Sequence, residues 1–461
     1  MKRAEIYPAD IARRRKAALQ VCTERSVNQV NISKIEKRID ATLSESRDEI
    51  IKIGRDILSL PELGYREEKT SAYIRRVFDS LGIDFSYPHA LTGIKAKLKG
   101  RESRYNICII GEMDAVKCAG HKNEGDLAAA HACGHNAQVA SMLGAAIALK
   151  RSGVMSELCG DITFMAVPAE EFIELDFRSK LKEEGKIRYF GGKQQLIYEG
   201  VFDDIDIAMM IHAEGNAPDG KMYLRGQNLG FNAKTITYKG RAVHGSTPFD
   251  GVNALNAAAL SILGIHSNRE TFREEEKIRI HPIITKGGDV VNSVPDEVCV
   301  DTYVRGATLE AIKKGSDAVT RSVSGACKII GAEYEIATIP GYLPLRESPE
   351  LSEVFEGVSE TVLKGENLIY GEPITGSSDI GDLSHILPTI QPSIGGFAGT
   401  LHSKEFEVIN EDFAYIKSAE ILAKTAAALL CDNAAKAKHV KESFKPVMTK
   451  DEYINYLNGK E

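Results

Sequence analysis

His131-Ala132-Cys133-Gly134-His135-Asn136 is the stretch of sequence that decides how the chain is interpreted. It places the sulfur of Cys133 two residues from the imidazole of His135, downstream of the acidic segment Gly111-Glu112-Met113-Asp114. Cysteine and histidine are preferred Zn²⁺ ligands, and a Cys-x-His pair on a short loop can hold one metal or bridge two. Because a single pair of this kind also occurs by chance, a metal site requires carboxylate and imidazole partners elsewhere.

Two carboxylates follow the apolar run Ile162-Thr163-Phe164-Met165-Ala166-Val167, which the pattern predicts to be a buried strand. They are Glu170 and Glu171, in Pro168-Ala169-Glu170-Glu171. Successive side chains near the end of a strand point to opposite sides, so one Glu could bind a metal while the other faces the water on that metal. The alternative is that both carboxylates leave the strand into solvent.

Further candidates also follow apolar runs. His212 follows residues 207–211, and His402 lies in the glycine-containing segment 399–406. A histidine at the end of a strand is often structural, but the recurrence of such positions along one chain favours a shared metal site. Asp114 follows the apolar residues 107–110, where a carboxylate could hydrogen-bond a ligating imidazole and fix its tautomer. An ordinary polar strand end is the alternative for Asp114.

With these motifs the sequence resembles the metal-dependent amidohydrolases that include p-aminobenzoyl-glutamate hydrolase, the indole-acetyl-amino-acid hydrolases, and related aminoacylases and carboxypeptidases. The resemblance covers about residues 48 to 430. Besides the segments quoted above, it rests on Pro61-Glu62-Leu63-Gly64-Tyr65 with Lys69-Thr70-Ser71, Lys239-Gly240-Arg241-Ala242-Val243-His244, Gly251-Val252-Asn253-Ala254-Leu255, Asn292 with Pro295, Ser378-Asp379-Ile380-Gly381-Asp382, and Leu401-His402.

The resemblance implies a site with two divalent metal ions per subunit, zinc or manganese. It implies Glu170 as the general base and His244 as a group that stabilises the oxyanion, from the same subunit or from its dimer partner. The alternative for His244 is an exposed loop histidine before a helix. The implied metal ligands are Cys133, His135, Glu171, His212 and His402.

Substrate contacts are expected from Asn292, Ser378 and Arg305, of which Arg305 is a candidate clamp for a carboxylate. Asp114 is expected behind the ligands rather than among them. The chain departs from the indole-acetyl type at Asn136, where many relatives have Asp, and this variant is closer to the aminobenzoyl-glutamate side of the family.

The chemistry of amide hydrolysis fits these residue types. Two metal ions roughly 3.5–4 Å apart lower the pKa of bound water from about 15.7 towards about 7 and stabilise the developing oxyanion. Glu170 would take the proton from the water and deliver it to the departing amine, which is a poor leaving group unless protonated.

The order of apolar segments predicts an α/β fold with two domains. Strand-like and helical stretches alternate from residue 50 to about 225, which indicates a mixed sheet flanked by helices. The pattern then changes to strand, helix, strand, strand, helix, strand, which resembles an inserted ferredoxin-like α+β lid. We therefore expect an N-terminal helical extension at 1–45, a zinc-exopeptidase-like catalytic domain at 46–228 and 340–461, and a lid and dimerisation domain at 229–339.

Length and composition restrict the remaining possibilities. The 461 residues, 43% of them hydrophobic, suffice for more than one domain. A net charge of −7 provides no basic field, so we expect neither nucleic acid nor a membrane surface as a partner. We find no signal-like apolar region, no long apolar run and no dense cysteine framework among the eight cysteines, and we expect a cytoplasmic protein.

The sequence thus predicts a metal-dependent amidohydrolase that cleaves the bond between an acyl, aryl or amino-acyl group and an amino acid. The expected substrates are small molecules of the p-aminobenzoyl-glutamate, N-acyl amino acid or dipeptide type, and the expected assembly is a homodimer formed through the lid. Two alternatives remain: a catalytically silent binding or regulatory protein on the same fold, and an enzyme that uses Cys133 as a covalent nucleophile.

Overall fold

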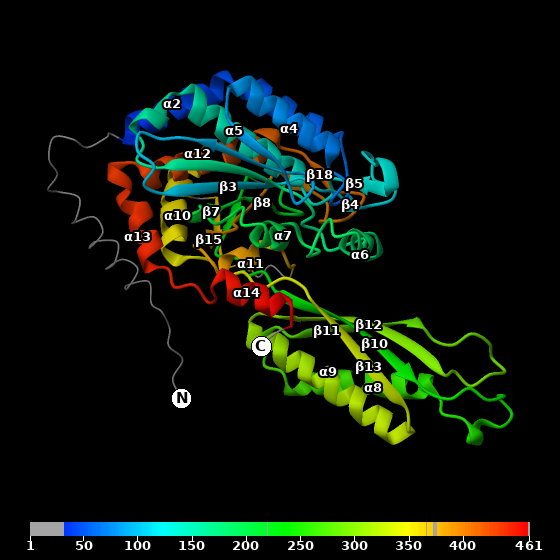
Figure 1. The fold of residues 1–461 in the computed structure, drawn as a ribbon. Helices are drawn as coiled ribbons and strands as arrows, with labels where there is room; N and C mark the ends of the chain where they lie inside the picture. The colour runs from blue at the N-terminus through cyan, green and yellow to red at the C-terminus, as the bar shows by residue number, and fades with distance from the viewer. Residues whose placement is uncertain (1–31, 219, 366, 372–375, 460–461) are drawn as a thin grey trace.

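The computed structural model describes residues 32–218, 220–365, 367–371 and 376–459. The secondary structure is arranged in two bodies, a larger one built on a six-stranded sheet and a smaller, elongated one built on a four-stranded sheet (Figure 1). Within the described residues, no helix is long and apolar enough to cross a membrane. Residues 1–31 of the expected N-terminal extension lie outside the described part of the chain.

The sheet of the larger body is mixed, as predicted. Its strand order is β1 (Phe85–His89), β2 (Gly93–Leu98), β6 (Asp161–Val167), β3 (Asn106–Glu112), β7 (Ile207–Met209) and β15 (Thr389–Ile390). The pairs β6–β3, β3–β7 and β7–β15 are parallel, whereas β1–β2 and β2–β6 are antiparallel. Every residue of β3 and β6 is buried, as expected for strands with helices on both faces.

Two hydrophobic cores cover the two faces of this sheet, because side chains alternate along a strand. Ile107 and Ile109 of β3 belong to one core, and Cys108 and Ile110 belong to the other. The first core includes α2 (Ile32–Glu45), α3 (Arg47–Leu58), α4 (Glu68–Leu81), α5 (His135–Arg151), α10 (Pro349–Leu363), α12 (Ser418–Leu430) and α13 (Ala435–Ser443). The second includes α6 (Leu175–Glu183), α7 (Gly192–Tyr198), α11 (Ile380–Ser384) and α14 (Lys450–Leu457).

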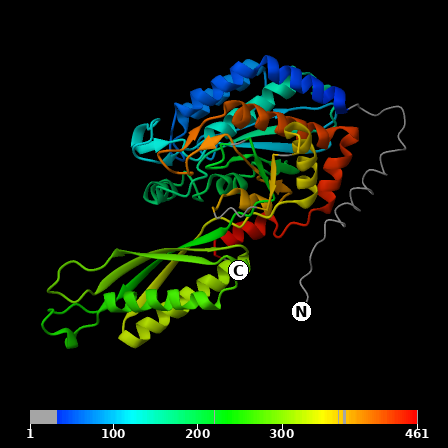
Figure 2. The same ribbon diagram turned by 180° about the vertical axis from the view of Figure 1, so that it is seen from behind.

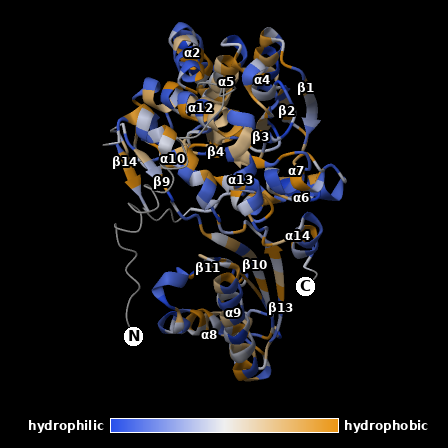
Figure 3. Cartoon of the chain, turned by 90° about the vertical axis from the view of Figure 1, so that its left-hand side faces the viewer, coloured by the Kyte–Doolittle hydropathy of each residue, from blue (hydrophilic) through white to orange (hydrophobic). Residues whose placement is uncertain are grey.

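Helix α5 is the central helix of the first core. It is buried along almost its whole length and packs against α12, α3 and α2. By contrast, α2 buries only one side, through Ile35, Ile39 and Leu43, and its mixed hydropathy is visible in Figure 3. Part of the predicted N-terminal extension is therefore packed on the main core.

The smaller body is an antiparallel sheet covered on one face by two helices. Its strand order is β11 (Arg279–Lys286), β12 (Glu297–Gly306), β10 (Gly230–Lys239) and β13 (Glu333–Pro340). Helices α8 (Ala254–Ser267) and α9 (Leu309–Ile330) pack on the face turned away from the larger body (Figures 1 and 2). The predicted order of strands and helices in this segment is confirmed.

Short strands join the parallel sheet to the loops at its edge. A second four-stranded sheet has the order β14 (Leu368–Tyr370), β9 (Met222–Leu224), β16 (Ser393–Ile394) and β8 (His212–Ala213). Two two-stranded ribbons are formed by β4 (Val116–Lys117) with β5 (Ala129–Ala130) and by β17 (Phe397–Ala398) with β18 (Glu407–Val408). The carboxyl ends of β3, β6 and β7 lie at the same edge of the main sheet, where α/β proteins commonly bind ligands.

Candidate metal centre

The turn Cys133-Gly134-His135 leads directly into α5. Gly134 has a φ of 79°, in the left-handed region, and a Cβ at this position would lie 2.4 Å from the Cβ of Ala213. Only glycine combines this conformation with such a close approach. The turn thereby holds the Cys133 sulfur and the His135 ring beside the segment that carries His212.

The predicted ligands converge on the edge of the main sheet. The sulfur of Cys133 lies 3.6 Å from Nε2 of His212 and 3.2 Å from Nε2 of His402. The same atom of His402 lies 3.1 Å from Oε1 of Glu171. These residues form two groups, Cys133 with His135 and His212, and Cys133 with Glu171 and His402, in each of which the potential ligand atoms lie within 4.8 Å of one another.

These separations fit metal coordination. With bonds of about 2.3 Å to sulfur and about 2.0–2.1 Å to nitrogen or oxygen, neighbouring ligand atoms of a tetrahedral zinc ion are roughly 3.3–3.6 Å apart. The distances of 3.1–3.6 Å between these side chains lie within this range or slightly below it. In addition, Nε2 of His135 is buried and makes no hydrogen bond among the described residues. Because Cys133 belongs to both groups, the arrangement suits two ions that share one thiolate.

The protonation of Cys133 also favours this role. Burial and the nearby Glu171 act to raise the pKa of the thiol, but His135 and His212 outweigh them and lower it to about 5. The thiolate is the form that binds metals. The pKa of His402 is raised to about 11 by its hydrogen bonds with Cys133 and Glu171.

The rings of His135 and His212 are oriented by their other nitrogen atoms. Nδ1 of His135 lies 2.8 Å from the backbone oxygen of Asp114 and 3.2 Å from its Oδ1. Nδ1 of His212 lies 2.7 Å from the backbone oxygen of Ala213. In each ring an Nδ1–H donor therefore leaves Nε2 free to face the cavity. The structure places Asp114 beside Nδ1 of His135.

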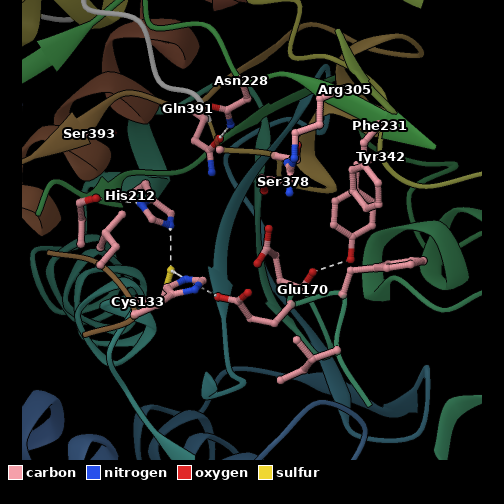
Figure 4. A pocket seen from close by; sticks show the side chains of 18 of the residues that line it. Cys133, Glu170, His212, Asn228, Phe231, Arg305, Tyr342, Ser378, Gln391 and Ser393 are labelled. Carbon is pink, nitrogen blue, oxygen red and sulfur yellow. Dashed lines mark hydrogen bonds and ion pairs between the residues drawn. The ribbon is translucent and has the colours of Figure 1, made fainter. Parts of the chain in front are cut away.

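Glu170 faces the same cavity from the end of β6 (Figure 4). Its Oε2 lies 4.0 Å from Nε2 of His135. Burial, together with the negative charges of Glu112 and Glu171, raises the pKa of Glu170 well above its ordinary value. A raised pKa makes the carboxyl group a better proton acceptor, which suits an acid–base group.

A pocket of about 440 Å³ opens from Cys133, Glu170 and His212 towards the smaller body. Arg305 and Ser378 line it, and aromatic side chains form one wall (Figure 4). Nη1 of Arg305 donates a hydrogen bond of 2.6 Å to Oγ of Ser377, and burial lowers the pKa of the guanidinium. Among the described residues, no carboxylate forms an ion pair with Arg305, so its charge is available to a ligand.

The model of peptidase family M20/M25/M40 matches residues 108–430. The chain belongs to this family. Thermostable carboxypeptidase 2 of Saccharolobus solfataricus is 26% identical over 383 residues, which cover 80% of this chain and 90% of the relative. IAA-amino acid hydrolase ILR1-like 2 of Arabidopsis thaliana is 25% identical over 386 residues, which cover 79% of this chain and 82% of the relative.

Among solved structures, a dinuclear metal binding peptidase of Bacillus subtilis from the M20 family superposes with a TM-score of 0.68. At 21% identity it covers 84% of this chain and 99% of its own, which shows a shared fold. The predicted fold class and the predicted family are therefore confirmed, and this M20-family protein is a metallo-hydrolase of amide bonds.

Two predicted residues lie outside the pocket of this M20-family hydrolase. His244 and Asn292 are exposed on neighbouring loops of the smaller body. The loops are joined by a hydrogen bond of 2.7 Å from the backbone N–H of Gly245 to the backbone oxygen of Asn292. Within one chain, neither side chain lines the pocket that contains Cys133 and Glu170.

The structure also shows functional neighbours that the sequence did not reveal. Lys193 is fully buried. Its Nζ forms one ion pair with Glu112 and a second, of 2.5 Å, with Oδ1 of Asp379. Oε2 of Glu112 lies 3.3 Å from Nε2 of His135. The acidic residues belong to motifs that were recognised, but Lys193 comes from a region where spacing gave no signal. Tyr342, whose hydroxyl donates to the backbone oxygen of Glu170, was likewise missed.

Proposed function

We propose that this M20-family hydrolase cleaves the amide bond between an acyl, aryl or amino-acyl group and an amino acid whose carboxylate is bound by Arg305. The observation that carries the proposal is the position of Arg305, a largely buried guanidinium that opens into the same pocket as Cys133 and Glu170 without an acidic partner among the described residues. Burial strengthens the attraction of such a cation for a carboxylate, and a guanidinium can bind both carboxylate oxygens.

We assign two metal ions to the site. His135 and His212 would hold one ion together with Cys133, while Glu171 and His402 would hold the other together with the same thiolate. Cysteine and histidine favour zinc, whereas manganese accepts sites with carboxylate and imidazole ligands, so both metals belong in the first assays. When bound, the ions would supply a water of lowered pKa and a positive field for the oxyanion.

The remaining steps fall to the side chains. Glu170 accepts the proton of the attacking water, keeps it because the buried carboxyl has a raised pKa, and delivers it to the nitrogen of the departing amino acid. Arg305 and Ser377 hold the carboxylate of that amino acid, and Ser378 lines the same wall of the pocket. The two ends of the substrate are thus fixed on either side of the scissile bond.

We further propose that the segment 229–339 acts as a lid and as a dimerisation domain, inserted between the catalytic segments 46–228 and 340–461. The chain enters the smaller sheet at Gly230 and leaves it at Pro340, on the neighbouring strands β10 and β13. His244 and Asn292 are exposed on this body, so they would complete a site only by lid movement or in the partner subunit of a homodimer. A thiolate ligand suits the cytoplasm, which is the location we propose.

The proposal is tested by measuring amine release from N-acyl amino acids, p-aminobenzoyl-glutamate and dipeptides, each paired with a derivative whose carboxylate is blocked as an amide. The protein is supplied with Zn²⁺ or Mn²⁺, and a control contains EDTA. We expect metal-dependent cleavage that strongly prefers the free carboxylate. Activity that survives chelation but not alkylation would instead identify Cys133 as a nucleophile, and the absence of cleavage with either metal would favour a binding protein.

A further inference from the structure

Residues 61–71, which we call the motif Pro61–Ser71, have no role in the reaction described so far, although the family resemblance rests in part on the segments 61–65 and 69–71 within them. In the structure the motif lies beneath residues 168–171, which we call the catalytic turn because they carry Glu170 and Glu171. Ala169 in this turn has a φ of 53°, in the left-handed region that residues other than glycine rarely adopt. A strained residue immediately before the proposed base requires a specific support.

Glu67 of the motif provides that support. Its carboxylate is fully buried, and Oε1 accepts a hydrogen bond of 2.8 Å from the backbone N–H of Ala169. Oε2 accepts a hydrogen bond of 2.6 Å from the hydroxyl of Thr92. The backbone oxygen of Thr92 in turn accepts a hydrogen bond of 2.8 Å from Ser71, at the end of the same motif. Both carboxylate oxygens are therefore fixed.

Two backbone oxygens of the catalytic turn also accept hydrogen bonds. The backbone oxygen of Ala169 accepts a hydrogen bond of 3.0 Å from the N–H of Gly192, and the backbone oxygen of Glu170 accepts one from the hydroxyl of Tyr342. Gly192 approaches so closely that a Cβ on it would lie 1.6 Å from the backbone oxygen of Pro168.

Both backbone polar groups of Glu171 form hydrogen bonds. Its N–H donates a hydrogen bond of 2.9 Å to Oδ2 of Asp114, the residue that also orients His135. Its backbone oxygen accepts a hydrogen bond of 2.5 Å from Nη2 of the fully buried Arg178. Hydrogen bonds from several segments therefore fix the backbone on both sides of the two glutamates.

The rest of the motif makes room for this arrangement. A Cβ on Gly64 would lie 2.5 Å from Nη2 of Arg178 and 2.8 Å from the Cα of Ala169, so the motif requires glycine there. The hydroxyl of Tyr65 donates to the backbone oxygen of Tyr189 at 3.1 Å, and the guanidinium of Arg178 lies 5.3 Å from the centre of the Tyr65 ring. The motif therefore packs directly against the catalytic turn and against Arg178, which binds it.

We propose that Glu67 is a positioning residue that keeps Ala169 in its left-handed conformation and thereby sets the direction of Glu170 and Glu171. This inference rests on the proposed function, because it assigns the turn to the general base and to a metal ligand. Without an acceptor at Glu67, the buried N–H of Ala169 loses its partner and the turn relaxes to an ordinary conformation. Glu67 does not line the pocket that contains Arg305, so its loss should affect turnover more than substrate binding.

Three variants separate this role from a general effect on folding. Glu67→Leu removes both acceptors at similar size, Glu67→Gln retains one acceptor for Ala169 and turns its amide towards the hydroxyl oxygen of Thr92, and Glu68→Leu makes the same chemical change at the exposed neighbour. For each variant, kcat and KM, bound metal, the melting temperature and the visible spectrum of the Co²⁺-substituted protein are measured. The Co²⁺ spectrum reports the coordination geometry independently of turnover.

For Glu67→Leu we expect kcat to fall by roughly 10–100-fold, as for other residues that orient metal-site groups, with KM within about threefold. The metal content is retained, while the Co²⁺ spectrum changes because Glu171 is displaced. Glu67→Gln should recover most of kcat, and Glu68→Leu should match the wild type. Wild-type kcat and spectrum in Glu67→Leu, or equal losses in the Leu and Gln variants with a lowered melting temperature, would overturn the proposal.

If Glu67→Leu does not fold, Thr92→Val provides the decisive variant, because it removes the donor that fixes Oε2 and leaves the carboxylate in place. A smaller loss of kcat with a shifted Co²⁺ spectrum supports the role of Glu67, whereas wild-type values for both contradict it. If the wild type cleaves no substrate, the proposed function fails, but the Co²⁺ spectra and chelator competition still decide whether Glu67 sets the geometry of the turn.

Discussion

In the larger body, side chains from distant segments converge on one cavity, whereas in the smaller body His244 and Asn292 lie on exposed loops outside it. Most of the first set follows buried parallel strands or begins a helix that is buried along its length, and His402 lies in the turn between β17 and β18. The second set is attached to loops at the edge of a sheet with one open face. The difference indicates that the candidate ligands are brought together within one chain, whereas His244 and Asn292 would reach the pocket only by movement of the smaller body or from a second subunit.

The largest effect is expected in the larger body, at Glu170. Glu170→Gln keeps the shape of the side chain but removes its ability to take a proton, so kcat should fall by roughly 10²–10⁴-fold. Steady-state kinetics with metal analysis by mass spectrometry checks this. Bound metal should be unchanged, because the assigned ligands are intact. Hydrolysis at the wild-type rate by the metal-loaded variant would show that Glu170 is not the base.

His244→Ala tests the other side of the comparison. Loss of a group that stabilises the oxyanion should lower kcat by roughly 10²–10³-fold, with no change in melting temperature because the side chain is exposed. If the residue acts across a homodimer, subunit exchange between His244→Ala and Glu170→Gln creates one intact site in each mixed dimer. About a quarter of the wild-type activity should then return, given random exchange. No recovery in exchanged dimers would place His244 in its own subunit or outside the reaction.

The contrast between the two bodies also explains which features could be predicted from the sequence alone. Residues 131–136, 168–171 and 402 carry metal-binding chemistry at the ends of apolar runs, and the sheet then brings them together. The order of strands and helices in the smaller body was also predicted: the helix at 309–330 has a strong apolar periodicity, and the helix at 254–267 is an apolar segment long enough for a buried helix. Local pattern and long-range contact agree at these positions.

Other contacts could not be inferred, because they depend on tertiary packing that leaves no local trace. Lys193 meets Glu112 and Asp379 across 81 and 186 residues of sequence. Glu67 reaches Ala169 across 102 residues, and nothing in the chain near Ala169 predicts its left-handed conformation. The exposed position of Asn292 is equally inaccessible to sequence analysis, since a motif identifies a residue and does not place its loop, whereas an exposed loop before a helix was one of the two interpretations of His244.

Arg305 joins the two bodies, because it extends from β12 into the cavity of the larger body. Arg305→Met should lower kcat/KM for substrates with a free carboxylate by roughly 10–100-fold, mainly through KM, since a charged hydrogen bond contributes about 1.5–3 kcal/mol. Substrates whose carboxylate is blocked should change little. Equal losses of kcat/KM for both kinds of substrate would mean that Arg305 packs against the aromatic wall and does not bind the carboxylate.

Glu347 offers the smallest and most specific test, because it is a half-buried carboxyl of the larger body that is not among the proposed metal ligands. Burial raises the pKa of Glu347 from 4.5 to about 7, and its Oε1 accepts a hydrogen bond of 3.1 Å from the backbone N–H of Gln391. The folded protein therefore holds the proton more tightly than the unfolded chain does. The contribution of Glu347 to the free energy of unfolding is complete below about pH 4.5 and is lost as the pH rises to about 7.

Glu347→Gln keeps the acceptor for Gln391 but cannot ionise, so its stability relative to the wild type should increase between pH 5 and pH 8. The change should be on the order of 1–3 kcal/mol, which urea unfolding of both metal-loaded proteins at the two pH values can resolve. Comparing the two proteins at each pH removes the contributions of all other titrating groups. If the difference in the free energy of unfolding between the two proteins does not depend on pH, Glu347 is ionised in the folded protein, and burial does not raise its pKa.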